Sequence, residues 1–264
     1  MKFFLFILVI SSVLITAQEI VTLKSENTPF ADTSLVFTPK NYNKSVKYPA
    51  VFLLHGWGGN HYQWSEFVNL RKLSDDYNFI IICPDAFNDS WYVNNPVRKN
   101  SRYADFFIKE LIPYITNKYS VNKENIFVSG LSMGGFGAVS FFLDNQNLFK
   151  SCASTSGVLN LKTFKNSLGL EKAIGIYEDN PENYTNVNVI EKLDKLKQIK
   201  PFMIDCGTED RIYVTNKEFY EKCLGNKIPL TFISQPGKHD RAYWGKAILN
   251  HFNFFRKILE SANN

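Results

Sequence analysis

A serine lies inside a glycine-rich pentapeptide at residues 130–134, GLSMG, directly after a short apolar run. The run predicts a buried strand, and the small residues that follow predict a helix packed closely against it. Such a turn holds its serine in a strained conformation with the hydroxyl clear of the sheet. Unpaired N–H groups at the start of the helix would stabilise negative charge nearby. The pattern therefore predicts Ser132 as a nucleophile and the Met133 amide as a donor to an oxyanion, against the alternative of an inert packing turn.

A second oxyanion donor is expected from the loop that follows an earlier strand. Residues 55–59, HGWGG, come directly after the apolar run 49–54, and their glycines let the chain turn closely past the serine. We predict the amide of Trp57 as this donor. The amide of Gly58 or of Gly59 is the alternative.

A serine hydroxyl needs a neighbouring imidazole to take its proton at neutral pH. The chain has four histidines. His239 follows the last predicted strand, in the kind of loop where doubly wound sheets build active sites, and is the predicted base. We expect His55 to make structural hydrogen bonds, His61 to lie near a pocket rim and His251 to be packed or exposed on the last helix.

The imidazole in turn needs a carboxylate that fixes its tautomer and stabilises its cation. Three acids lie in or just after the penultimate predicted strand: Asp205, Glu209 and Asp210. Asp205 falls within the strand pattern, whereas the other two fall in the loop behind it. We predict Asp210, with Glu209 and Asp205 as alternatives. The order serine, aspartate, histidine along the chain fits this prediction.

Alternating strand-like and helix-like segments must position these residues. Apolar runs predict strands at 34–38, 49–54, 79–83, 125–129, 152–155, 202–206 and 230–233. Apolar residues at helical spacing predict helices at 64–73, 103–119, 135–143, 217–224 and 242–259. The alternation predicts an α/β fold in one domain, with a mostly parallel, twisted sheet and helices on both faces. Residues 158–200 lack strong strand signals and predict a short lid-like insertion.

The stretch 85–100 is polar and aromatic without a clear period, which predicts a loop. Trp91 and Tyr92 within it are predicted to contact the substrate. The alternative is that both side chains only anchor the long loop by packing.

Residues 1–17 differ from the rest of the chain. A short positive region precedes an almost purely apolar run that ends in small residues, which is the layout of a secretory signal peptide. The run is short for a membrane span, and an uncleaved anchor is the alternative. We expect cleavage near Gln18, one catalytic domain at 18–264, a secreted or periplasmic location and no stable membrane span after cleavage.

The composition excludes several other classes of protein. Hydrophobic residues make up 45% of the 264 and charged residues 21%, as in an ordinary globular domain with one core. The net charge of +5 is not clustered, so no nucleic acid partner is expected.

The four cysteines show no CxxC and no zinc spacing. We predict buried free thiols, with one disulfide as the alternative, and neither a metal nor an organic cofactor.

Together these motifs resemble the esterase D-type family of α/β-hydrolases, which includes feruloyl, acetyl-xylan and tributyrin esterases, S-formylglutathione hydrolases and mycolyltransferases. The similar parts are residues 53–56, 130–135, 206–210, 239–240 and 243–244. The resemblance covers nearly the whole chain after residue 17. It implies the α/β-hydrolase fold, a triad of Ser132, Asp210 and His239, and oxyanion amides at Met133 and Trp57.

Two departures narrow the substrate that the resemblance implies. The formylglutathione hydrolases commonly carry a histidine before the serine, where this chain has Leu131, and they are cytoplasmic. We therefore expect a secreted serine carboxylesterase for small acyl or aryl esters, including feruloyl or acetyl-xylan esters linked to plant polysaccharide. An acyltransferase with the same triad and a non-catalytic exported carbohydrate-binding protein are the alternatives. S-formylglutathione hydrolysis is less favoured.

Overall fold

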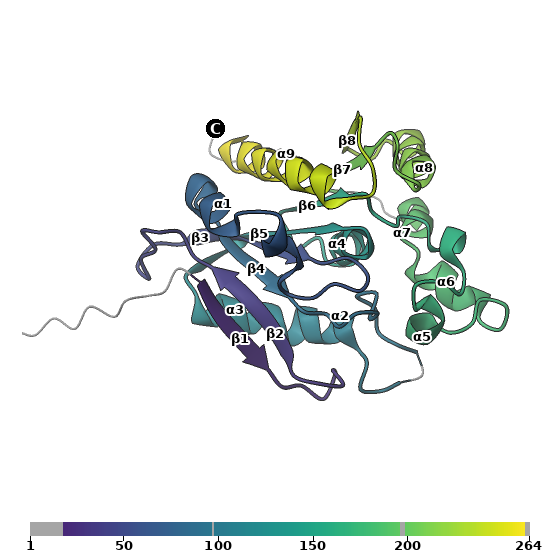
Figure 1. Cartoon of the computed structure of the whole chain (residues 1–264), viewed down its shortest axis with the longest axis horizontal. Coiled ribbons are helices and arrows are strands. Elements are labelled where there is room, and N and C mark those ends of the chain that lie inside the picture. Colours follow the sequence, from purple (N-terminus) through teal and green to yellow (C-terminus); the bar gives the residue numbers. More distant parts are fainter. Residues whose placement is uncertain (1–17, 97, 196–198, 262–264) are drawn as a thin grey trace, which may run out of the picture.

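The computed structural model describes residues 18–96, 98–195 and 199–261, and the predicted signal peptide at 1–17 lies outside them. The centre of the molecule is an eight-stranded sheet with helices on both faces (Figure 1). Its strands are β1 (Gln18–Leu23), β2 (Asp32–Phe37), β3 (Tyr48–Leu54), β4 (Ile80–Pro84), β5 (Val121–Leu131), β6 (Ser151–Thr155), β7 (Phe202–Gly207) and β8 (Leu230–Gln235). All seven predicted strands are present, and β1 is an additional edge strand that the sequence did not predict.

Helices connect the strands and cover the sheet. The α-helices are α1 (Leu70–Tyr77), α2 (Tyr103–Phe106), α3 (Ile112–Lys118), α4 (Met133–Asp144), α5 (Leu170–Ile174), α6 (Pro181–Val187), α7 (Val189–Lys192), α8 (Tyr213–Gly225) and α9 (Arg241–Ser261). Shorter helical segments are η1 (Gln63–Glu66), the π-helical η2 (Phe107–Leu111), η3 (Leu161–Phe164) and η4 (Leu193–Lys195).

The strand order is β1-β2-β4-β3-β5-β6-β7-β8. The pairs β1/β2 and β2/β4 are antiparallel, and every other neighbouring pair is parallel. This confirms the predicted mostly parallel sheet. The chain leaves β3 toward β4 and then returns to β5 on the other side of β3. Open α/β sheets bind ligands at such a reversal, beyond the carboxyl ends of the strands.

Successive residues of the central strands enter two separate apolar cores. Phe52 and Leu54 of β3 join the core formed with α3, α4 and α8, whereas Val51 and Leu53 join the core formed with α1 and α9. Both faces of the strand are therefore buried. This is why its sequence is continuously apolar and does not alternate between apolar and polar residues. Figure 1 shows α9 lying across the face opposite α2 and α3.

Two predicted helices differ in detail from the observed ones. The segment 64–73 divides into η1 and α1, because Asn69 leaves the helical conformation and its side chain caps α1 by accepting from the Lys72 amide at 3.0 Å. The predicted helix at 103–119 is continuous through α2, η2 and α3, with a π-helical turn in the middle. Pro113 lacks an N–H and its ring crowds the carbonyl four residues earlier, which lies in this wider turn.

The predicted insertion is present between β6 and β7 and contains α5, α6 and α7. It packs against the loop at 85–100, where the Trp91 indole N–H donates to the carbonyl of Leu168 at 2.8 Å. The side chain of Asn95 donates to the Lys172 carbonyl at 2.7 Å. Within the described residues, none of the helices combines the length and the apolar character that crossing a membrane requires.

Candidate active site

Ser132 occupies a strained turn between β5 and α4. Its φ of 53° and ψ of −115° lie in a region that side-chain-bearing residues rarely adopt. Glycines on both sides allow this turn. A Cβ on Gly130 would lie 2.2 Å from the carbonyl oxygen of Gly134, and one on Gly134 would lie 2.3 Å from that of Leu54. The strand, the helix and the preceding loop therefore approach each other more closely than larger residues permit.

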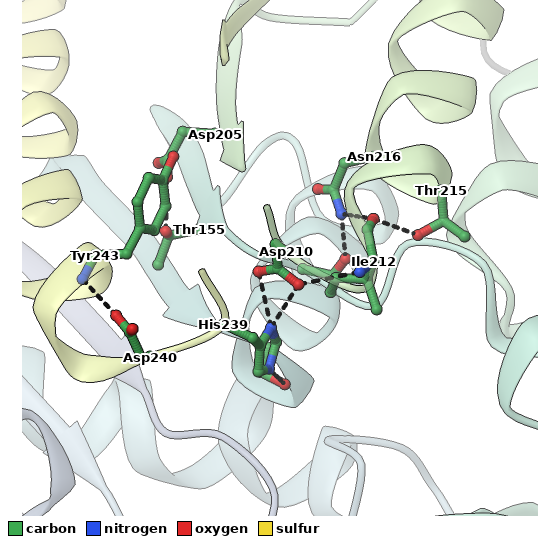
Figure 2. A network of polar contacts seen from close by, with 11 residues as sticks. Thr155, Asp205, Asp210, Ile212, Thr215, Asn216, His239, Asp240 and Tyr243 are labelled. Atoms are coloured by element: carbon green, nitrogen blue, oxygen red, sulfur yellow. Dashed lines mark hydrogen bonds and ion pairs between the residues drawn. The ribbon is translucent and has the colours of Figure 1, made fainter. Parts of the chain in front are cut away.

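The structure brings the three predicted side chains together. The hydroxyl of Ser132 lies 3.1 Å from Nε2 of His239. Nδ1 of His239 lies 2.9 Å from Oδ2 and 3.1 Å from Oδ1 of Asp210 (Figure 2). These contacts fit the neutral tautomer in which Nδ1–H donates to the carboxylate and Nε2 accepts the serine proton.

Asp210 is fixed by the turn that follows β7. Its amide donates to the Gly207 carbonyl at 3.0 Å, and its Oδ1 accepts from the amide of Ile212 at 3.0 Å. The Asp210 side chain is 0% exposed. Burial raises the pKa of this carboxyl, but hydrogen bonds from His239 and Ile212 outweigh burial and hold the pKa below its usual value. Asp210 is therefore a stable anion beside the imidazole.

The alternative acids do not reach His239. Glu209 is exposed, and its carboxylate lies 3.9 Å from the ammonium of Lys238. Asp205 points from β7 toward α9, where its Oδ2 lies 2.5 Å from Nε2 of His251.

The loop that carries His239 is held by close packing. A Cβ on Gly207 would lie 2.2 Å from the carbonyl oxygen of Gly237, so the loops after β7 and β8 touch through their backbones. A Cβ on Gly237 would lie 2.1 Å from the ring of Tyr243. The Trp244 indole meets the His239 ring edge to face at 5.0 Å. The first turn of α9 therefore sets the position of the imidazole.

The loop at residues 55–59, predicted to supply an oxyanion donor and called the oxyanion loop below, lies directly beside Ser132. A Cβ on Gly56 would lie 3.5 Å from Cβ of Ser132. The amides of Gly58 and Gly59 already donate to the carbonyls of Asn88 at 3.1 Å and Gly56 at 3.0 Å. Among the described residues, none accepts a hydrogen bond from the Trp57 amide. This amide, together with that of Met133 in the first turn of α4, remains available to a ligand.

The predicted substrate contacts of Trp91 and Tyr92 are wrong. Their side chains are 0% and 1% exposed. The Trp91 indole donates to the Leu168 carbonyl, and the Tyr92 hydroxyl donates to the carbonyl of His55 at 2.9 Å. Both residues also have positive φ, so the loop folds inward and buries the two rings. They anchor this loop against the insertion and the oxyanion loop. The indole of Trp57, one residue after the glycine that lies beside Ser132, is 48% exposed.

Two other histidines support the same region. His55 is buried and contacts the backbone carbonyls of Gly56, at 2.8 Å, and Asp85. Burial lowers the pKa of its imidazole to about 4. His61 contacts the Asp85 carboxylate at 2.8 Å and stays partly exposed. The expected structural role of His55 is confirmed.

Gln63 is a residue of the site that the sequence did not reveal. Its Oε1 accepts from the Gly56 amide at 2.7 Å and thereby holds the oxyanion loop from the η1 side. A glutamine in a polar stretch carries no local signal for such a contact, because the contact depends on how η1 folds back.

The four cysteines are buried and free, which confirms the prediction of free thiols. Burial raises the pKa of the Cys83 and Cys152 thiols well above the usual value. Within the described residues, no cluster of three or more metal-ligating side chains is present.

A cavity of about 730 Å³ lies away from this site, between the end of α9 and the amino ends of β5 to β8. Phe149, Lys200 and Phe254 are among its lining residues. Because these strands are parallel and Ser132 follows the carboxyl end of β5, the cavity lies at the opposite ends of the strands from Ser132. Hydrogen-bond geometry, rather than cavity size, therefore locates the candidate active site.

The sequence matches the family model described as "Putative esterase" over residues 27–255. The chain belongs to this esterase family. An acetyl esterase from Caldicellulosiruptor saccharolyticus is 25% identical over 265 residues, which cover 90% of this chain and 96% of the relative. The chain is accordingly a carboxylic ester hydrolase.

Solved structures share the fold. A ferulic acid esterase superposes with a TM-score of 0.77 at 25% identity, over 91% of this chain and 98% of its own. The fluorophosphonate-binding serine hydrolase F of Staphylococcus aureus superposes with a TM-score of 0.81 at 23% identity, over the same shares of the two chains. The predicted α/β-hydrolase fold is confirmed.

Proposed function

We propose that this esterase is a secreted serine carboxylesterase that hydrolyses small acyl or aryl esters, with Ser132 as nucleophile, His239 as base and Asp210 as its acidic partner. One observation carries this proposal: an uninterrupted hydrogen-bond chain joins the serine hydroxyl, the imidazole and a buried, ionised carboxylate. Such a chain activates a serine hydroxyl at neutral pH.

Acylation follows from the geometry. The Ser132 oxygen attacks the ester carbonyl carbon while its proton passes to Nε2 of His239, and the carbonyl oxygen becomes an oxyanion. The amides of Met133 and Trp57 donate to this oxyanion. The tetrahedral intermediate then collapses, the bond to the alcohol oxygen breaks, and the alcohol leaves with the proton from His239. Asp210 stabilises the imidazolium throughout.

Deacylation repeats these steps with water. His239 takes a proton from a water molecule, whose oxygen attacks the acyl carbon. The bond to the Ser132 oxygen breaks, the proton returns to that oxygen, and a carboxylic acid is released. An alcohol in place of this water would give acyl transfer, so the competition between water and added alcohol decides between hydrolase and transferase.

The substrate class is proposed from the surroundings of Ser132. Trp57, in the loop that passes beside Ser132, has a half-exposed indole, and Lys238 and Glu209 form a charged pair on the neighbouring loops. An aromatic surface suits an aryl or short acyl group. The relatives named acetyl esterase and ferulic acid esterase support the same class. Esters linked to plant polysaccharide are included in the proposal as members of this class.

The function is tested with a panel of aryl acetates, feruloyl esters, acetylated xylan and S-formylglutathione. We expect wild-type turnover of small esters, covalent labelling of Ser132 by a fluorophosphonate, and loss of both in Ser132→Ala. Near-wild-type hydrolysis by Ser132→Ala would show the mechanism to be wrong. Absence of labelling and turnover in the folded wild-type protein would favour a non-catalytic binding protein.

Export is a separate part of the proposal. It is supported by the apolar segment at residues 3–15 after a lysine and before small residues. Expression of the full chain, followed by fractionation and mass spectrometry of the N-terminus, tests it. We expect protein outside the cytoplasm that begins near Gln18, and an intact Met1 on cytoplasmic protein would contradict export.

A further inference from the structure

A second set of serine, histidine and aspartate side chains lies beneath the candidate active site. The Ser129 hydroxyl is 2.8 Å from Nδ1 of His251, and Nε2 of His251 is 2.5 Å from Oδ2 of Asp205. The Thr155 hydroxyl donates to Oδ1 of the same carboxylate at 2.6 Å. All four residues are 0% exposed. No substrate reaches them, so nucleophilic catalysis is not their role.

Ser129 and Asp205 lie at strand positions whose side chains point toward α9. Ser129 of β5 follows Phe127 by two positions, and Asp205 of β7 follows Met203 by two positions. Phe127 and Met203 belong to the core under α9. Polar groups thus replace apolar ones near the carboxyl ends of β5 and β7, where His251 of α9 meets them. A buried polar group without a partner is costly, so each contact fixes how these elements align.

We propose that Ser129, His251 and Asp205 are a buried positioning unit that holds β5, β7 and α9 in the alignment in which the catalytic triad can meet. Each of these elements leads into one triad residue. β5 ends one residue before Ser132, β7 ends three residues before Asp210, and α9 begins two residues after His239. The inference rests on the proposed function, because it assigns a role in aligning that triad.

Thr155 links the two sets directly. Its hydroxyl donates to Asp205, and its backbone carbonyl accepts from the amide of Ser132 at 3.1 Å. A shift of the Asp205 carboxylate would therefore move the residue that holds the strained serine turn.

The first turn of α9 provides a second link. Figure 2 shows the Tyr243 ring beside Asp205. Burial, together with the nearby Asp205 carboxylate, raises the pKa of the Tyr243 hydroxyl above its usual value. The same ring packs on Gly237, and the next residue, Trp244, packs on the His239 imidazole. The helix that His251 anchors therefore also carries the side chains that hold the general base.

The test compares His251→Gln with Phe252→Leu. The glutamine can keep the contact to Asp205 but loses the one to Ser129, which releases β5. Phe252 is the next residue of α9, equally buried, and it packs on Tyr77 and Phe79, away from the triad. Each variant is assayed with an aryl acetate at the same interval below its own Tm, so that a general loss of stability affects both alike.

We expect His251→Gln to lower kcat about 10- to 100-fold at unchanged KM, because a small misplacement of catalytic groups costs that much. The rate of fluorophosphonate labelling at Ser132 should fall by the same factor. Phe252→Leu should keep both rates while lowering Tm. Equal losses of kcat in the two variants would overturn the positioning role and leave only a contribution to stability.

Ser129→Ala is the second variant in case His251→Gln does not fold. It deletes only the hydroxyl on β5, and the same drop in kcat at unchanged KM is expected. A kcat equal to that of Phe252→Leu would overturn the inference. Activity retained by Ser132→Ala would instead overturn the proposed function, so the two failures are distinguishable.

Discussion

The two serine–histidine–aspartate sets of this protein contain the same groups at similar distances, yet only one can act on a substrate. Ser132 has a positive φ at the end of a strand, whereas Ser129 lies within regular β5. His239 is 16% exposed on a loop, and His251 is 0% exposed on a helix. The amide of Trp57, unpaired among the described residues, lies in the loop beside Ser132, whereas Ser129 is paired with Leu53 and Ala153 inside the sheet. The comparison shows that access and oxyanion donors, not the three side chains, define the catalytic site.

The largest contrast is expected between the two serines. Ser132→Ala removes the nucleophile and should lower kcat for an aryl acetate about 10⁶-fold, as removal of such a serine does in other triads. Ser129→Ala should cost about 1 kcal/mol of stability and keep measurable turnover. Steady-state kinetics and thermal unfolding of both variants measure this contrast. Similar kinetic losses would mean that the buried serine takes part in the chemistry.

The same change at the two aspartates gives the next contrast. Asp210→Asn presents an N–H to His239, favours the wrong tautomer and should lower kcat about 10⁴-fold. In Asp205→Asn the amide can donate to Nε2 of His251, whose Nδ1–H then donates to the Ser129 oxygen. The contacts persist with reversed direction, so kcat should stay close to wild type.

The downfield region of the proton NMR spectrum checks the same pair of variants. Each hydrogen-bonded imidazole N–H that faces a carboxylate should give one resonance, and each substitution should remove or shift its own resonance. A kcat for Asp205→Asn as low as that for Asp210→Asn would show that the buried set must conduct protons rather than only hold its contacts.

Substitutions in the oxyanion loop, which has no counterpart in the buried set, are expected to lower kcat by a smaller factor. Trp57→Pro removes the amide N–H and should lower kcat about 10²- to 10³-fold. Trp57→Ala keeps the N–H and should change mainly KM, because it removes only the exposed ring. Circular dichroism checks that both variants fold. A proline variant with the kcat of the alanine variant would place the oxyanion donor elsewhere.

The smallest effect concerns acid stability. The pKa of Asp210 is lowered in the folded state, so its contribution to stability is fully present above the ordinary carboxyl pKa of about 3.9 and is lost as pH falls through the lower folded value. Asp210→Asn should therefore lose less stability than the wild type over this acidic window. Urea unfolding between neutral pH and the acid limit measures it. Parallel curves would mean that the carboxylate is not stabilised by folding.

Much of the site could be predicted from local sequence. The strand, the glycines and the helix around Ser132 are neighbours in the chain, and a tight turn needs small residues wherever it occurs. The positions of Asp210 and His239 in loops behind apolar runs are equally local. Since parallel strands end at the same edge of a sheet, these loops could be expected to meet before any contact was known.

Only the tertiary structure decided which polar residues pair with which. Asp205 and Asp210 are five residues apart, yet one faces His251 and the other faces His239. Trp91 and Tyr92 looked suited to a substrate, but the backbone of their loop turns both rings inward. Such outcomes depend on packing between segments far apart in the chain, where burial and hydrogen bonding select one partner from several that the local sequence allows.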